Sequence, residues 1–302
     1  MAIVELDSIS KAYDKKVAVE RLSLRIEPGT MFGLLGPNGS GKTSSIRMMI
    51  GITRPDTGTV KLFGEPFQRA SLERVGYLPE ERGLYKKMIV LDQLIFLGQL
   101  HGLDHATAQK RATAWCERLQ ITEAIHKKTE ELSKGMQQKI QFIATLIHEP
   151  ELVIMDEPFS GLDPVNASLM QDTLLELRRE GKAILFSTHR MDQVEKMCDA
   201  ICVISGGKQI LAGGMREIKQ RYHNNRVQIA FEGSDAFLHH ESVASAKNWG
   251  GQAEVTLKDG ADAQALLAAA MQGAKVLRFE VSEPTLEQIF IETVGSGGRI
   301  DA

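Results

Sequence analysis

Cysteine, long apolar runs and net charge are all scarce in this 302-residue sequence. Its three cysteines, Cys116, Cys198 and Cys202, include no CxxC pair, so we expect buried thiols in a reducing compartment and no disulfide framework. No apolar run approaches the roughly 18 residues of a membrane-spanning helix, so a role at a membrane would need another chain. The net charge of −3 and the pI near 6.3 do not favour a nucleic-acid partner.

Apolar residues make up 43% of the chain and charged residues 25%, as in ordinary globular proteins. Strand patterns fill the first 35 residues, and we expect antiparallel strands there. Further on, the apolar strands 152–156, 183–188 and 200–206 alternate with helices, which indicates an α/β fold with a parallel sheet covered on both faces. Helical spacing of apolar residues dominates the stretch between them, so we expect an inserted helical subdomain at about 83–150.

A change of composition near 222–225 divides the chain into a domain at 1–222 and a second at 223–302. Beyond it we expect a strand, a helical stretch, a hairpin at Gly250-Gly251, then helix, strand and helix. The order βαββαβ is that of a small α+β, ferredoxin-like domain. The tail at about 295–302 is expected to be disordered.

A glycine-rich segment follows the apolar strand at 31–35 and precedes a helix. It matches GxxxxGK[ST], the phosphate loop of P-loop NTPases, in the strand–loop–helix context that the motif requires. Backbone N–H groups and the helix N-terminus would hold the phosphates, Lys42 would reach the β- and γ-phosphates, and Thr43 would bind Mg²⁺. The candidate nucleotide-binding residues here are Gly36, Pro37, Asn38, Gly39, Ser40, Gly41, Lys42, Thr43 and Ser44.

Two acidic residues end the strand at 152–156, on the edge of the sheet where the phosphate loop should lie. Asp156 suits a magnesium site, and Glu157 suits the polarisation of an attacking water near the γ-phosphate. Without the phosphate loop upstream, the same pair would be interpreted as a solvated strand end. With it, a catalytic interpretation is favoured.

Ser133-Lys134-Gly135 opens a helix, and alone it would indicate only a capping serine. The order along the chain is more informative: phosphate loop, Ser/Gly helix start, acidic strand end, SGLD, then His189 after a strand. In this order the chain resembles the nucleotide-binding subunits of ABC transporters over roughly residues 1–220. GPNGSGKT is similar to their Walker A motif, LVIMDEP to Walker B, LSKGM to the signature motif, SGLD to the D-loop and STHRM to the H-switch.

The resemblance implies a mechanism in which two subunits enclose two ATP molecules head to tail. It implies ATP and Mg²⁺ as cofactors, catalytic roles for Lys42, Glu157 and His189, and adenine stacking on Tyr13, for which plain surface packing is the alternative. The partner's nucleotide would be met by Asp163 of the D-loop and by the signature residues Ser133, Lys134, Gly135 and Met136.

Three positions depart from the family pattern. Lys134 replaces a glycine and Met136 a glutamine, and Lys134 could face either a phosphate or solvent. Glu80 stands in place of the Q-loop glutamine, where it would be a charged Mg²⁺ ligand; the alternative is an exposed carboxylate in a surface loop.

The segments YLPEERGLYKKM and SEPTLEQIFIETVG are similar to ABC-2-type exporters of the NatA-like group, which carry a C-terminal accessory domain. The likeness implies the ATPase subunit of an exporter, working as a homodimer or paired with a homologous subunit. It would sit on the cytoplasmic face of the membrane through a separate transmembrane permease chain, with no nucleic acid as partner. The apolar stretch 91–100 is either a docking surface or core. The alternative function is a soluble ABC-type ATPase acting on nucleic acid or ribosomes.

Overall fold

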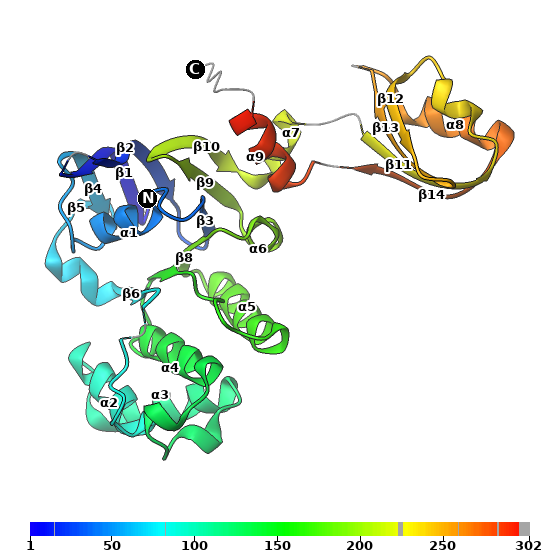
Figure 1. The fold of residues 1–302 in the computed structure, drawn as a ribbon. Helices are drawn as coiled ribbons and strands as arrows, with labels where there is room; N and C mark the ends of the chain where they lie inside the picture. The colour runs from blue at the N-terminus through cyan, green and yellow to red at the C-terminus, as the bar shows by residue number, and fades with distance from the viewer. Residues whose placement is uncertain (15, 82, 223–225, 259, 283, 296–302) are drawn as a thin grey trace. The chain divides into compact units, whose positions relative to one another are not determined.

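The computed structural model describes residues 1–14, 16–81, 83–222, 226–258, 260–282 and 284–295. Contacts divide the chain into two units, Met1–Met215 and Arg216–Ala302, each of which is described here by itself (Figure 1).

The first unit contains a ten-stranded mixed sheet in the order β5-β4-β1-β2-β10-β9-β3-β8-β7-β6. One side of it is antiparallel, as expected, where β1 pairs with both β2 and β4. This side comprises β1 (Val4–Tyr13), β2 (Lys16–Ile26), β4 (Thr57–Leu62) and β5 (Glu65–Pro66).

The other side of the sheet is parallel over five strands. These are β3 (Met31–Leu35), β6 (Val75–Leu78), β7 (Leu152–Asp156), β8 (Ala183–Thr188) and β9 (Ala200–Ser205). All residues of β3, β7 and β8 are buried, because a parallel sheet is covered on both faces. The carboxyl ends of these three strands therefore meet at one edge of the sheet, where the phosphate loop begins.

Strand β10 (Lys208–Gly214) was not anticipated from the sequence. It pairs antiparallel with β9 and touches β2 through Lys208 and Glu20, so it joins the parallel and antiparallel sides into one sheet.

The helices that accompany this sheet in the first unit are α1 (Lys42–Met49), α5 (Pro164–Arg179) and α6 (Met191–Met197), with a 3-10 helix at Arg69–Arg74. Helix α7 (Met215–Arg221) begins where the first unit ends.

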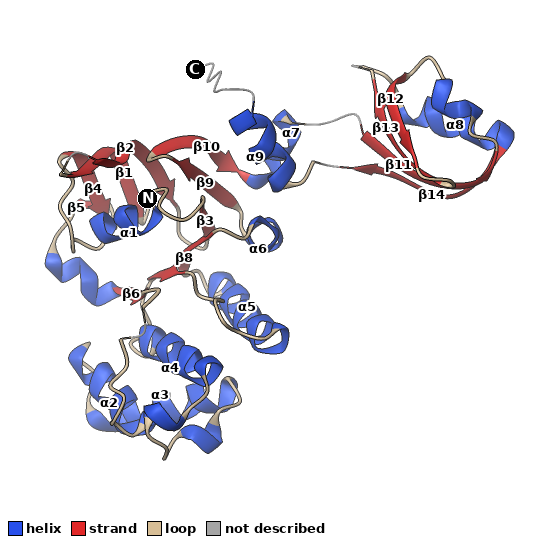
Figure 2. Ribbon diagram, viewed as in Figure 1, coloured by secondary structure: helices blue, strands red, loops and turns tan. Residues whose placement is uncertain are grey.

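The helical subdomain lies between β6 and β7 in the chain, as expected (Figure 2). It contains α2 (Val90–Leu100), α3 (His105–Arg118) and α4 (Lys134–Leu146), with 3-10 helices at Thr122–Ala124 and Thr129–Glu131. Ser133 begins α4 as its N-cap, and Phe142 on α4 is fully buried beside Trp115 of α3. The packing of α3 against α4 therefore positions the signature turn at Ser133.

The second unit contains a four-stranded antiparallel sheet in the order β12-β13-β11-β14, which is the ferredoxin-like order. Its elements are β11 (Arg226–Gly233), β12 (Val243–Asn248), β13 (Gln252–Leu257), α8 (Ala263–Gly273), β14 (Ala274–Ser282) and α9 (Leu286–Gly295). The hairpin expected at Gly250-Gly251 joins β12 to β13, with both glycines at positive φ.

One expected element of the second unit is shorter than predicted. The helical stretch between β11 and β12 is only a 3-10 helix at Ala236–His239, because few residues separate the two strands. Phe237 of this short helix packs its ring edge-on against Phe231 of β11, at 4.8 Å between centroids. The tail expected to be disordered, apart from Gly295, lies outside the described residues.

Candidate nucleotide-binding site

The loop between β3 and α1 has a backbone that only glycine adopts without strain. Gly36, Gly39 and Gly41 have φ values of 153°, 76° and 114°. A Cβ on Gly36 would lie 2.1 Å from the carbonyl oxygen of Ile204, and one on Gly41 would lie 2.4 Å from that of Ala18. The loop is therefore pressed against the neighbouring strands, which keeps its N–H groups in a fixed arrangement.

Lys42 and Ser40 give this loop the polar groups of an anion site. The Lys42 ammonium donates to the carbonyl oxygens of Gly36, at 2.7 Å, and Pro37, at 3.2 Å. Burial lowers the pKa of Lys42, and the charges of Glu157, Asp156 and Glu80 oppose that shift. The buried hydroxyl of Ser40 has no hydrogen-bond partner among the described residues. An anion with several acceptor oxygens, such as a polyphosphate, fits these donors.

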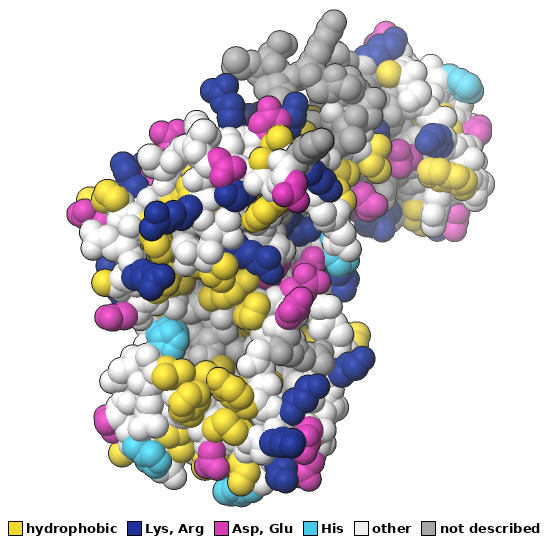
Figure 3. Space-filling view, turned by 60° about the vertical axis from the view of Figure 1, so that its left-hand side comes forward, with side chains coloured by type: hydrophobic (Ala, Val, Ile, Leu, Met, Phe, Trp, Pro, Cys, Tyr) yellow, Lys and Arg dark blue, Asp and Glu magenta, His cyan; other side chains and the backbone are white. Residues whose placement is uncertain are grey.

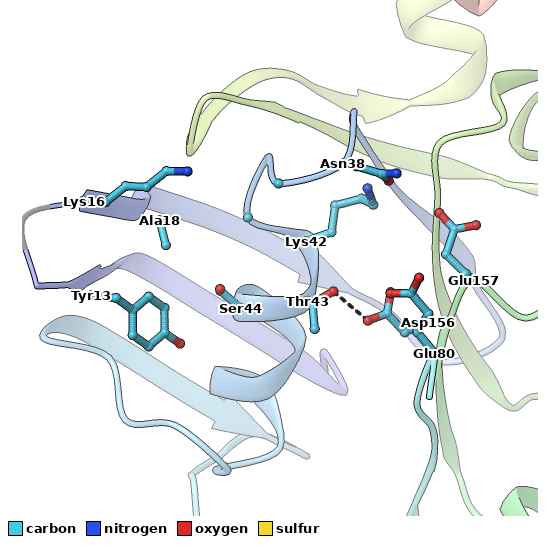
Figure 4. Close-up of a pocket in the computed structure, with 12 residues that line it drawn as sticks. Tyr13, Lys16, Ala18, Asn38, Lys42, Thr43, Ser44, Glu80, Asp156 and Glu157 are labelled. Atoms are coloured by element: carbon cyan, nitrogen blue, oxygen red, sulfur yellow. Dashed lines mark hydrogen bonds between the residues drawn. The ribbon is translucent and has the colours of Figure 1, made fainter. Parts of the chain in front are cut away.

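Asp156 lies at the carboxyl end of β7 and is 1% exposed. Its Oδ2 accepts a 2.8 Å hydrogen bond from Thr43 Oγ1, and its Oδ1 accepts one from the Ser187 hydroxyl (Figure 4). Strand register explains the second contact, since Asp156 and Ser187 are direct partners on β7 and β8. The hydroxyl oxygen of Thr43 on α1 and a carboxylate oxygen of Asp156 on β7 are thereby brought within hydrogen-bond distance of each other.

Glu157 follows with φ of 50°, a left-handed conformation that is costly for a non-glycine residue. Its carboxylate accepts hydrogen bonds from Thr188 Oγ1, at 3.2 Å, and from the backbone N–H of His189, at 3.1 Å. Its Oε1 also lies 2.8 Å from Nδ1 of His189. The predicted water-polarising carboxylate and the predicted switch histidine are thus in direct contact.

Lys42, Thr43, Asp156 and Glu157 share a single cavity of about 450 Å³. Four of the described residues predicted to act on this chain's own nucleotide are not part of its lining: Gly36, Pro37, Ser40 and His189. Its lining is Tyr13, Lys16, Ala18, Asn38, Gly39, Gly41, Lys42, Thr43, Ser44, Glu80, Asp156 and Glu157 (Figure 4). Sequence reasoning placed ten of these residues among the nucleotide-binding, catalytic or magnesium-binding candidates and missed Lys16 and Ala18. A signal for both existed, because alternate residues of β2 face the same way as they leave the turn after Tyr13.

The signature and D-loop residues form a second group. Ser133 accepts a 3.2 Å hydrogen bond from the N–H of Met136, and Asp163 accepts a 3.0 Å bond from the N–H of Asn166 as the cap of α5. That cap holds the pKa of Asp163 below its usual range. Within the part of the chain that the structure describes, neither residues 133–136 nor Asp163 contribute to the lining of the cavity.

The donor set of the cavity fits a nucleotide with Mg²⁺. Thr43, Asp156 and Glu80 offer the oxygen ligands that this hard cation takes. Among the described residues, no group of three or more His, Cys, Asp or Glu side chains is placed to hold a metal by itself. Magnesium in such a site is typically shared between one or two carboxylates and the phosphates, and it would neutralise phosphate charge there.

A parallel sheet that brings a phosphate loop, an aspartate and a glutamate to one cavity, with a histidine in contact with the glutamate, defines a P-loop nucleoside triphosphatase. Comparisons with known proteins narrow this class. Residues 19–160 match the model of the ABC transporter family, and residues 213–294 match the C-terminal domain of DrrA1-3-like ATP-binding proteins.

Curated relatives match along the length of the chain. YhaQ of Bacillus subtilis strain 168, an uncharacterized ABC transporter ATP-binding protein, is 41% identical over 97% of this chain and 99% of its own. The linearmycin resistance ATP-binding protein LnrL of the same strain is 33% identical over 97% and 98%. A Nod factor export ATP-binding protein I from Paraburkholderia xenovorans is 37% identical over 70% and 71%. The chain belongs to the ABC transporter ATP-binding proteins and carries a DrrA-like C-terminal domain.

A solved ATP-binding subunit of an ABC transporter has the same fold, with a TM-score of 0.68 and 27% identity over 73% of this chain and 93% of the other. Members of the family are ATPases, and so is this chain. Such subunits work with separate transmembrane permease components. In the described residues, no helix has the length and apolar character needed to cross a membrane.

Proposed function

We propose that the chain is the ATP-hydrolysing subunit of an exporter and works as a head-to-tail pair of ATPase domains on a separate transmembrane permease. The observation that carries this proposal is the division of the site into two groups. The cavity gathers the phosphate loop, Glu80, Asp156 and Glu157, whereas the signature turn at Ser133 lies on the helical subdomain and does not line it.

The cavity would hold this chain's own nucleotide. Tyr13 is 43% exposed at the cavity mouth, so its ring is available to stack on adenine. Lys42 would exchange its carbonyl partners for the β- and γ-phosphates, and Thr43, Asp156 and Glu80 would hold Mg²⁺. Glu157 would orient the attacking water, and His189 would contact the γ-phosphate and move when that phosphate leaves.

The second group would meet the nucleotide of a partner subunit. The start of α4 offers the Ser133 hydroxyl, the N–H groups of its first turn and the positive end of a helix dipole. Lys134 adds a cation beside them. A Cβ on Gly135 would lie 3.6 Å from the Leu162 side chain, so the signature turn and the D-loop that carries Asp163 adjoin one another. The signature turn and the D-loop would therefore reach the nucleotide of the partner subunit together.

An exposed apolar patch on the helical subdomain is the proposed contact with the permease. It consists of Tyr85, Ile89, Phe96 and Leu100, which are between 37% and 66% exposed. The rings of Tyr85 and Phe96 pack edge to face at 6.0 Å. Hydrophobic side chains gather on this subdomain in Figure 3. Two relatives are named for export or resistance, which supports an exporter, and docking would place the chain at the cytoplasmic face of the membrane.

The pairing mechanism is tested with Glu157→Gln, which should slow hydrolysis and leave the phosphate contacts intact. With ATP and Mg²⁺ the variant should elute from a sizing column at twice its mass. Adding Ser133→Arg should return it to the monomer while each chain still binds ATP, because that change blocks only the contact with the partner. A monomeric Glu157→Gln variant, or a Glu157→Gln/Ser133→Arg double variant that still dimerises, would contradict the mechanism.

The docking surface is tested by Phe96→Glu together with Leu100→Glu. This double variant should lose co-purification with the permease from native membranes, while its ATP-dependent dimer in the Glu157→Gln background is retained. Undiminished co-purification would show that the patch is not the contact.

A further inference from the structure

Lys16 is a residue of the nucleotide cavity that none of the sequence motifs includes. It is the first residue of β2 and the strand partner of Tyr13, so it leaves the turn directly opposite the proposed base-stacking ring. Ala18, two positions further along β2, lines the same cavity. Because side chains alternate along a strand, Lys16 and Ala18 point to one face, and that face is the cavity wall.

The phosphate loop rests on this part of β2. The position of a Cβ on Gly41 would be 2.4 Å from the carbonyl oxygen of Ala18, so the strand and the loop are in close backbone contact. Lys16 lies one alternation, roughly 6.5 Å, before Ala18 on the strand, and its long flexible stem can cover that distance. Figure 4 shows its ammonium extending from β2 toward the loop, with the three carboxylates on the far side of Lys42.

Charge is unevenly distributed along the cavity. Glu80, Asp156 and Glu157 lie at one end with Lys42, where the terminal phosphates and Mg²⁺ would sit. The described lining residues contain one further cation, Lys16, and it lies at the Tyr13 end of the cavity, beside the loop. A nucleoside di- or triphosphate with its base on Tyr13 and its terminal phosphates on Lys42 would have its α-phosphate between these two ends of the cavity.

We propose that Lys16 binds the α-phosphate and fixes the span between base and terminal phosphates, as a positioning residue of the nucleotide site. This inference rests on the proposed use of the cavity for ATP. It predicts a charge-dependent contribution to affinity that is present for ADP as well as ATP, because both carry the α-phosphate. The contribution does not depend on dimerisation, since Lys16 belongs to the cavity of its own chain.

The experiment is calorimetric titration of the full-length chain with MgADP. Lys16→Met keeps most of the aliphatic stem and removes the charge, so affinity should fall about tenfold, as for loss of a charge-assisted hydrogen bond. Lys16→Arg should retain affinity within about threefold, because the cation is kept. The matched control is Lys61→Met, on β4 at the far end of the same antiparallel sheet, where Lys61 pairs with Glu5. This control should leave affinity unchanged.

Lys42→Ala separates this inference from the site assignment itself. If Lys42→Ala and Lys16→Met both weaken MgADP and Lys16→Arg does not, the proposal stands. If Lys42→Ala weakens binding but Lys16→Met does not, or if Lys16→Arg is as weak as Lys16→Met, the role of Lys16 is wrong and the site remains. If Lys42→Ala leaves MgADP affinity unchanged, the nucleotide site is wrong, and the inference falls with it.

Discussion

The imidazole Nδ1 of His189 lies 2.8 Å from Oε1 of Glu157, and the backbone N–H of His189 donates to the same oxygen. The two residues follow the ends of neighbouring parallel strands, β8 and β7. Register sets them side by side, since Asp156 pairs with Ser187. The proposed water-polarising carboxylate and the proposed phosphate-sensing imidazole are in direct contact, so we expect them to act as one unit.

This contact predicts non-additive effects on hydrolysis. Glu157→Gln and His189→Ala should each lower kcat by roughly 10²-fold or more, the usual contribution of a positioned acid–base group. The double variant should be little worse than Glu157→Gln alone, because residues that act as a unit do not contribute independently. Steady-state phosphate release from the three variants tests this. Multiplicative losses would indicate that the two side chains act separately.

The phosphate loop offers a matched pair of glycine substitutions. Gly41→Ala should abolish nucleotide binding, because its Cβ would lie 2.4 Å from the Ala18 carbonyl and force the loop off β2. Gly39→Ala meets no atom within 4 Å, so only the strain of its positive φ remains, about 1 kcal/mol. Titration with MgADP should find weak but measurable binding for Gly39→Ala. Equal affinity of the two variants would count against the close contact.

The motif residues could be located from the sequence because the phosphate loop, the acidic strand end and the histidine are each set by a few neighbouring residues. A strand–loop–helix context needs only local pattern, and the parallel sheet brings Asp156 and Thr43 together without further information. The edge where they meet follows from the buried character of β3, β7 and β8.

Contacts between distant segments could not be predicted in this way. Strand β10 carries no buried residue over its length, so its pattern gives little signal, and only pairing with β9 defines it. Lys16 was missed because its position depends on the cross-strand register with Tyr13. The 3-10 helix at Ala236–His239 replaces a longer one because the connection is short, and helical pattern alone does not report connection length.

We expect His148 to make folding stability depend on pH. It stacks on His101, at 3.8 Å between ring centroids, and its Nδ1 is buried without a hydrogen-bond partner among the described residues. Burial, with the charge of His101 adding to it, lowers the pKa of His148 from 6.5 to about 4. Between pH 6.5 and about pH 4, His148 is protonated in the unfolded chain and neutral in the folded chain. The free energy of unfolding therefore falls as pH drops through this window.

The expected loss attributable to His148 is about 2 kcal/mol between pH 7 and pH 4, after allowance for partial exposure. His148→Gln should flatten the dependence of the unfolding midpoint on pH across that range. His126→Gln is the control, because His126 is exposed. Thermal unfolding of the three proteins at several pH values measures the slopes. A His148→Gln slope as steep as that of the unchanged protein would assign the effect to other groups.

Glu80 places a third carboxylate in a cavity that also holds Asp156 and Glu157. Glu80→Gln removes one negative charge beside the expected position of the γ-phosphate. ATP without Mg²⁺ should then bind several-fold more tightly, because repulsion is reduced, and a higher Mg²⁺ concentration should be needed for half-maximal hydrolysis. Glu81→Gln is the matched control, since Glu81 is the next residue and does not line the cavity. Nucleotide titrations in EDTA and Mg²⁺ titrations of hydrolysis measure both effects. A Glu80→Gln variant that matches Glu81→Gln in both would place the Glu80 carboxylate outside the metal site.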